Sequence, residues 1–236
     1  NLMLAAAQAK IERIVYTSSV ATLGLNSDGA PADETTAVTL ADMIGHYKRS
    51  KFLAEAEVKR LAEEENLPVV IVNPSTPVGP SDIRPTPSGR VIIDAASGRI
   101  PAYVDTGLNL VHVDDVAAGH LLALTRGTIG ERYILGAQNM TLKELLTQVA
   151  ILAGQSPPKV RLPRNLILPI AYLAEAWAKY VGSGEPLITV DGVRLAKKYM
   201  FFSSKRAEHE LGFHPRPVEE ALYDAVDWFQ KHNYLH

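Results

Sequence analysis

The chain has 236 residues, no cysteine and nearly balanced charge, with 24 basic against 26 acidic side chains. This length can bury the core of one domain, or of one domain with a smaller appended lobe. The lack of cysteine excludes disulfides and thiolate nucleophiles, and the balanced charge gives no reason to expect nucleic acid as a partner. The seven histidines lack metal-type spacing, so no metal site is predicted.

Strand-like and helix-like segments alternate through the first part of the chain. Residues 1–9 have the pattern of the end of an amphipathic helix, and Ile14, Val15 and Tyr16 are the β-forming residues of a buried strand. This order favours the α/β class, with a parallel sheet covered by helices. The elements expected next are a helix from Tyr47 to about residue 66, a strand at 69–73, a helix at 89–96, a strand at 109–113, a helix at 116–124 and a strand at 133–135.

The connection that follows the strand at 69–73 is long and rich in proline, from Pro74 to Pro87. Long loops at the ligand edge of a sheet tend to be functional. Beyond residue 140 the pattern becomes helical, so a lobe boundary is expected there. A capping box at Thr141 and Glu144 opens this part, and further helices are expected at 163–181, 187–199, 204–211 and 218–232.

Two apolar stretches bear on membrane association. Residues 1–9 lack a basic region and are too short to span a bilayer. Pro169, Glu175 and Lys179 interrupt the segment 163–181, which favours a buried or pocket-lining helix, with an interfacial helix as the alternative. We therefore expect no transmembrane segment and a cytoplasmic location.

Tyr47 and Lys51 form the most informative motif of the chain. Their spacing places a phenol and an ammonium on the same face of a helix. A buried ammonium next to a phenol favours the phenolate, which allows a tyrosine to act as an acid or base near neutral pH. Such pairs also arise by chance, and then both side chains belong to a solvated helix face.

Hydroxyl side chains follow the first strand at Thr17, Ser18 and Ser19. Open α/β sheets bind their ligands at the carboxyl ends of the strands. A hydroxyl at that edge can hydrogen-bond a substrate oxygen while Tyr47 exchanges a proton with it. A pair of serines also suits a turn or a helix N-cap, which is the interpretation favoured for Ser18.

Polar residues also follow the strand at 109–113. Asp114 is expected to be the N-cap of the helix at 116–124, and the pair Asp114 and Asp115 fits a helix start better than a general acid and base. His112 could touch a substrate or be satisfied by the backbone, and the sequence leaves both open.

The order of these segments resembles the extended short-chain dehydrogenase/reductase family, also called the NAD-dependent epimerase/dehydratase family. The resemblance covers nearly the whole chain. Two segments, the loop after Asn73 and Met200-Phe-Phe-Ser-Ser204, are similar to the hopanoid-associated sugar epimerase group, with dihydroflavonol-reductase-like enzymes as the neighbouring branch. The motifs that carry the family resemblance are Thr17-Ser18-Ser19, Tyr47-x-x-x-Lys51, Asn73-Pro74 with Val78-Gly79-Pro80, Leu110-Val-His112-Val-Asp114-Asp115-Val-Ala117, and Glu210-Leu-Gly-Phe213-His-Pro215.

The resemblance implies a Rossmann-like, doubly wound parallel sheet, truncated at its N-terminal side, with a smaller and mostly helical substrate lobe. Residues 1–140 would be the C-terminal portion of the NAD(P)-binding domain, with 74–107 an excursion toward the substrate lobe. Residues 141–236 would be that lobe.

The resemblance also implies roles for individual residues. Tyr47 would be the catalytic acid and base, Lys51 would hold the nicotinamide ribose and lower the pKa of Tyr47, and Ser19 would hydrogen-bond the reacting oxygen. The cofactor would be NAD or NADP. The residues implied to bind it are Thr17, Ser18, Tyr47, Lys51, Pro74, Ser75 and Thr76.

The family's cofactor fingerprint, Gly-x-x-Gly-x-x-Gly after the first strand, is nowhere in this sequence. Gly127-Thr-Ile-Gly130 follows a helix and precedes a strand, the reverse of the required order, and is expected to be a helix-ending turn. The chain therefore resembles the family with about three βα units removed, on the order of ninety residues. A non-catalytic dinucleotide sensor and an inactive fragment are the alternatives to an active enzyme.

The expected reaction is hydride transfer between nicotinamide and a secondary alcohol or ketone, with the proton passing through Tyr47. A sugar nucleotide or another sugar conjugate is the expected substrate, and a dihydroflavonol-type ketone is the alternative. Epimerases and reductases share the same catalytic residues, so the sequence does not separate them. The expected partner is this small molecule, and a homodimer is left open.

Overall fold

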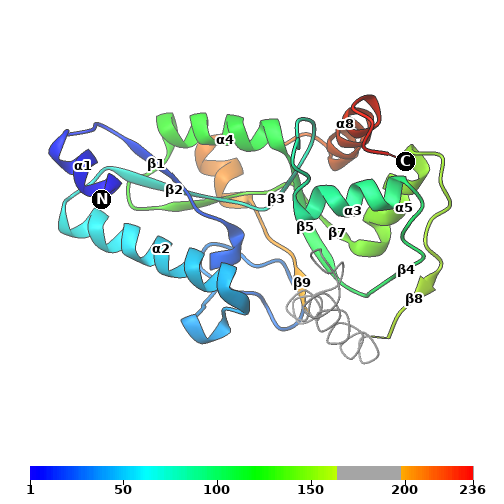
Figure 1. Cartoon of the computed structure of the whole chain (residues 1–236). Helices are drawn as coiled ribbons and strands as arrows, with labels where there is room; N and C mark the ends of the chain where they lie inside the picture. The colour runs from blue at the N-terminus through cyan, green and yellow to red at the C-terminus, as the bar shows by residue number, and fades with distance from the viewer. Residues whose placement is uncertain (164–197, 236) are drawn as a thin grey trace, which may run out of the picture. The chain divides into compact units, whose positions relative to one another are not determined.

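The computed structural model describes residues 1–163 and 198–235, which fall into two compact units (Figure 1). The first unit combines 1–79, 109–139 and 201–221, and the second takes the described parts of 80–108, 140–200 and 222–236. Residues 201–221 thus group with the first unit, beyond the boundary expected near residue 140. The assignment of cofactor and substrate binding to separate lobes stays a prediction. The helices expected at 163–181 and 187–199 lie almost wholly outside the described residues.

The first unit is built on a parallel three-stranded sheet with the order β1-β2-β6. β1 (Ile14–Thr17) pairs with β2 (Val69–Pro74), and β2 pairs with β6 (Arg132–Leu135). Every residue of β2 is buried, as expected for a central strand with helices on both faces. The predicted parallel α/β sheet is therefore confirmed.

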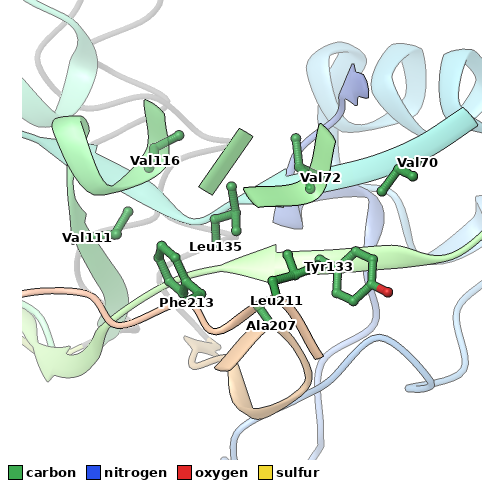
Figure 2. Packing of buried hydrophobic residues seen from close by; sticks show 10 residues of the cluster. Val70, Val72, Val111, Val116, Tyr133, Leu135, Ala207, Leu211 and Phe213 are labelled. Atoms are coloured by element: carbon green, nitrogen blue, oxygen red, sulfur yellow. The ribbon is translucent and has the colours of Figure 1, made fainter. Parts of the chain in front are cut away.

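Alternate residues of β2 contact two different layers, as the twofold period of a strand requires. Val69 and Ile71 pack against Val58 of α2, together with residues of α1. Val70 and Val72 belong to a second cluster, to which α4 and η3 also contribute (Figure 2). Figure 1 shows α2 and α4 on opposite sides of β1 and β2. The helical segments of this unit are α1 (Leu2–Gln8), η1 (Val20–Thr22), η2 (Leu40–Asp42), α2 (Gly45–Glu64), α4 (Val113–Arg126) and the π-helical η3 (Ala207–Leu211).

The start of α4 differs from the prediction. The helix begins at Val113, and its N-cap is His112 rather than Asp114. The Nδ1 atom of the buried His112 accepts a hydrogen bond from the backbone N–H of Asp114 at 3.0 Å. The prediction of Asp114 as the cap was wrong because the imidazole already supplies the acceptor that a helix start needs. Gly127 ends the helix, as expected.

A second group of strands continues from the carboxyl end of β2. β3 (Thr76–Val78) lies inside the proline-rich connection and pairs in parallel with β5 (Gly107–His112). β7 (Gln138–Thr141) follows β5 in the sheet order, and β9 (Tyr199–Met200) pairs with the start of β5. β3, β7 and β9 were not among the expected elements.

The second unit contains helices and one short pair of strands. α3 (Pro87–Ala96) packs on α5 (Leu142–Leu152), and β4 (Ala102–Tyr103) pairs with β8 (Val160–Arg161). The capping box predicted at the start of α5 is confirmed, because Thr141 and Glu144 exchange side-chain and backbone hydrogen bonds. The last helix is α8 (Val218–Lys231). Within the described parts of the chain, no helix is long and apolar enough to cross a membrane.

Candidate functional site

Tyr47 and Lys51 lie in the first half of α2, which runs from Gly45 to Glu64. The spacing of four residues places both side chains on one face of this helix, as predicted. The side chain of Tyr47 is 62% exposed, and that of Lys51 is half-buried. The Ser50 hydroxyl donates a hydrogen bond to the Tyr47 carbonyl oxygen at 2.9 Å. Tyr47 therefore stands open to solvent, where a ligand can reach it.

The two serines that follow β1 have different roles. Ser19 is the N-cap of η1, and its Oγ accepts a hydrogen bond from Ala21 N at 3.1 Å. Ser18 is buried, and its hydroxyl donates to Glu55 Oε2 at 2.5 Å. The N-cap role favoured for Ser18 therefore falls to Ser19. The Ser18 hydroxyl proton is engaged inside the protein, whereas Ser19 lies at the partly exposed start of a turn.

Glu55 joins α2 to the ends of the neighbouring strands. Besides Ser18, its Oε2 accepts hydrogen bonds from Thr22 Oγ1 at 2.7 Å and Asn73 Nδ2 at 3.0 Å. Its Oε1 lies 2.9 Å from Lys59 Nζ and 3.2 Å from Arg132 Nη1. Glu55 is buried, so the carboxylate makes all these contacts away from water.

These contacts decide the ionisation of Glu55. Burial alone would raise the pKa of its carboxyl group. The hydrogen bonds from Ser18, Lys59 and Thr22, together with the charge of Lys59, outweigh this effect and lower the pKa from 4.5 to about 2. Glu55 is therefore a carboxylate at any ordinary pH. The sequence prediction did not include it, although its place one turn after Lys51 on the same helix face was a usable signal.

The end of β2 carries two buried polar atoms without a protein partner. Asn73 is fully buried, and its Nδ2 also donates to Ser19 O at 3.0 Å, but its Oδ1 has no partner. The Oγ of Ser75 is likewise buried without a partner. Leaving such an atom unsatisfied costs about 1–3 kcal/mol. Both atoms belong to the carboxyl end of a central strand, where a ligand's polar groups could satisfy them.

His112 at the end of β5 and Asp115 shortly after it have structural partners. His112 caps α4, which supports its backbone-satisfied interpretation. Asp115 is buried and accepts hydrogen bonds from Arg216 N at 2.8 Å and Arg216 Nε at 3.0 Å. Asp114 is 64% exposed in its side chain. The paired carboxylates thus mark a helix start, as the sequence favoured, and Asp115 also forms an ion pair with Arg216.

His120 is a neighbour of the site that the sequence did not reveal. Its Nε2 lies 2.9 Å from Thr17 Oγ1, and its Nδ1 lies 2.7 Å from Val116 O. Because a carbonyl only accepts, Nδ1 carries a proton and donates it to Val116 O, which fixes the ring with Nε2 beside the Thr17 hydroxyl. His120 therefore orients one of the hydroxyls predicted to bind the cofactor.

Known proteins resemble this chain over its whole length. The sequence profile of the NAD dependent epimerase/dehydratase family matches residues 1–136. A Synechocystis protein provisionally named dihydroflavonol 4-reductase is 44% identical over 100% of this chain and 69% of its own length. The crystal structure of gox2253 has a TM-score of 0.87 at 55% identity and covers 100% of this chain and 71% of that one. The Pseudomonas aeruginosa protein PA4631, a nucleoside-diphosphate-sugar epimerase, has a TM-score of 0.83 at 29% identity, over 99% of this chain and 72% of its own.

Proposed function

Because the chain belongs to the NAD-dependent epimerase/dehydratase family, we propose that it oxidises or reduces a secondary alcohol or ketone with Ser19, Tyr47 and Lys51 as its catalytic residues. Membership confirms the predicted resemblance and the Rossmann-like α/β fold. It also shows an NAD-dependent enzyme of the extended short-chain dehydrogenase/reductase type. The roles of Ser19, Tyr47 and Lys51 and the identity of the substrate are proposals.

The chemistry assigns one task to each residue. When bound, NAD or NADP supplies the hydride donor or acceptor. Tyr47 passes the proton to or from the substrate oxygen, and Lys51, one helical turn later, holds the nicotinamide ribose. Ser19 hydrogen-bonds the same substrate oxygen from the carboxyl end of β1. Ser18 is excluded from this task because its hydroxyl already donates to Glu55.

One observation carries the proposal. Through Glu55, the helix that bears Tyr47 and Lys51 is tied to Ser18 and Asn73. These two residues directly precede Ser19 and Pro74 in the chain. A single buried carboxylate thus links the three segments to which the roles are assigned, which supports their working together.

The end of β2 fits the nicotinamide half of the cofactor. The unpartnered Ser75 Oγ and Asn73 Oδ1 offer a donor and an acceptor at the carboxyl edge of the sheet. Nicotinamide carries a carboxamide group that could satisfy both. Pro74, Ser75 and Thr76 would border it, with Thr17 and Ser18 on the neighbouring strand end.

We propose a sugar nucleotide or another sugar conjugate as the substrate. The similarity to a nucleoside-diphosphate-sugar epimerase at 29% identity supports this choice. The similarity to the dihydroflavonol 4-reductase-named protein keeps a flat phenolic ketone as the second candidate. Residues 141–236, with 74–107, would form the substrate-binding lobe.

Product analysis separates these substrates. The complete protein, with any residues that flank this chain, is incubated with nicotinamide cofactor and either sugar nucleotides or dihydroflavonol-type ketones. Inversion of a sugar carbon, or net oxidation or reduction of a sugar, is the expected result. Robust reduction of the ketones with no change in any sugar nucleotide would reverse the choice.

Replacing Tyr47 tests the catalytic assignment. Tyr47→Phe removes the proton but keeps the ring, so turnover should fall by about 10²–10⁴-fold while cofactor affinity stays close to that of the wild type. Lys51→Ala should lower both the turnover and the affinity for the cofactor. Tyr223→Phe is the matched control, because Tyr223 is similarly exposed at 58% but lies on α8. Normal turnover in Tyr47→Phe would refute the assignment.

A further inference from the structure

We infer that Glu55 is a positioning residue that sets where Tyr47 and Lys51 stand relative to the strand ends. This inference rests on the proposed function, because it gives Glu55 a role only through those two residues. Glu55 itself is buried and faces the protein interior, so it is not offered as a group that touches the substrate.

The two oxygens of Glu55 take different kinds of partner. Oε2 accepts only from neutral donors, which are Ser18, Thr22 and Asn73. Oε1 faces the cations of Lys59 and Arg132. The neutral donors come from the ends of β1 and β2 and from η1, and the cation of Arg132 comes from β6. One side chain therefore fixes α2 against every strand of the β1-β2-β6 sheet.

The position of Glu55 along α2 determines which residues of the helix this contact holds in place. Glu55 and Val58 are the two buried residues of the helix, and Glu55 is the one closer to its start. At 1.5 Å per residue, Tyr47 lies about 12 Å from Glu55 along the helix axis, toward the start of α2. In the apolar cluster that α2 shares with α1, β1 and β2, its residues are Val58 and Ala62, in the second half of the helix. α2 also contacts η1 and η2. Glu55 adds the buried polar link from α2 to η1 and the strand ends, and it lies closer to Tyr47 and Lys51 than that cluster does.

A neutral amide at position 55 cannot reproduce these contacts. A glutamine offers one acceptor oxygen and one donor nitrogen. Whichever way it turns, its NH₂ group faces at least one group that cannot accept a hydrogen bond, either Asn73 Nδ2 or the cations of Lys59 and Arg132. We therefore expect Glu55→Gln to loosen the link between α2 and the strand ends without removing volume from the interior.

The experiment compares Glu55→Gln with Glu57→Gln in the complete protein. Glu57 makes an exposed ion pair with Arg60 on the same helix, so it controls for loss of a helical glutamate. At a temperature where circular dichroism shows both variants folded, we expect kcat of Glu55→Gln to fall by about 10–100-fold, the effect of a displacement of about 1 Å, with KM for substrate changed far less. Glu57→Gln should match the wild type.

Amide hydrogen exchange reports on the link between α2 and the strand ends independently of activity. Glu55→Gln should speed amide exchange in residues 19–22 and 45–51, and Glu57→Gln should not. Thr22→Val, which removes one donor to Glu55 and nearly preserves side-chain volume, should shift both readouts in the same direction by a smaller amount. If Glu55→Gln does not fold, Thr22→Val tests the positioning role of Glu55 in its place.

The outcomes separate this proposal from the proposed function. Normal turnover in Tyr47→Phe would overturn the catalytic assignment and this proposal with it. An inactive Tyr47→Phe beside a folded Glu55→Gln with wild-type kcat would overturn the positioning role alone. A slow Glu55→Gln with unchanged exchange at 45–51 would also overturn it, because the effect would not pass through the position of α2.

Discussion

Two buried glutamates of the first unit have pKa values shifted in opposite directions. Glu55 has a pKa lowered to about 2 because its hydrogen bonds and the charge of Lys59 outweigh its burial. Burial dominates at Glu34 and raises the pKa of its carboxyl group, although Ile134 N donates to its Oε1 at 2.8 Å. The first carboxylate stabilises the fold as an anion, whereas the second is costly when ionised.

Acid should therefore remove the contribution of Glu55. Its folded-state pKa lies below the unfolded value of 4.5, so the stabilisation is complete above that value and is lost as the pH falls toward about 2. The shift corresponds to about 3 kcal/mol of unfolding free energy. Urea denaturation at about pH 5 and about pH 3 should show a larger loss for the wild type and for Glu57→Gln than for Glu55→Gln. Equal losses in all three would contradict this account.

Glu34 should show the opposite dependence. Its raised folded-state pKa means that its contribution is most favourable below the unfolded value of 4.5 and is lost as the pH rises through the folded-state value. Glu34→Gln, whose amide oxygen can still accept from Ile134 N, should therefore gain stability relative to the wild type between about pH 4 and about pH 7. Denaturation at both pH values measures this difference. A difference that does not change with pH would disprove it.

At the scale of elements, periodic segments were predictable and short ones were not. α2 and α4 have a helical period, and β2 and β6 contain runs of apolar, β-forming residues. β7 has the sequence Gln-Asn-Met-Thr, which is not an apolar run, and β9 comprises only Tyr199 and Met200. Their pairing with β5 depends on contacts between distant parts of the chain, which a local pattern does not contain.

Substitutions at the start of α4 test which residue is its N-cap. His112→Ala removes both the acceptor for Asp114 N and a buried ring, so it should cost at least about 1–2 kcal/mol of unfolding free energy. Asp114→Ala, at the position that the sequence alone favoured as the cap, should cost only about 0.5 kcal/mol through the helix dipole. Thermal or urea denaturation of the two variants gives the comparison. The reverse ranking would restore Asp114 as the cap.

At the scale of the whole molecule, the sequence predicted the exposed part of the candidate site and missed its support. Tyr47 and Lys51 are found by spacing within one helix. Glu55 acquires its partners from residues 18, 22, 73 and 132, which only the folded sheet brings together. No local pattern predicts such a cluster, because its members are far apart in the chain.

The missing glycine fingerprint leads to a prediction about residues 1–236 alone. Much of the affinity for a dinucleotide comes from pyrophosphate at a helix N-terminus behind a glycine-rich turn. No such motif is in this sequence, so the remaining residues would contact mainly the nicotinamide half. Calorimetry should detect no micromolar binding of NAD or NADP. Micromolar binding to a well-behaved monomer would show that another part of the chain holds the pyrophosphate.

Tyr47 is proposed to exchange a proton with the substrate oxygen during hydride transfer. Single-turnover transfer of deuterium from nicotinamide labelled at C4 to the substrate carbon, measured in the complete protein, tests this role. The wild type and Tyr223→Phe should transfer the label at equal rates, whereas Tyr47→Phe should bind the labelled cofactor equally well and transfer it about 10²–10⁴-fold more slowly. Transfer at the wild-type rate in Tyr47→Phe would contradict the account.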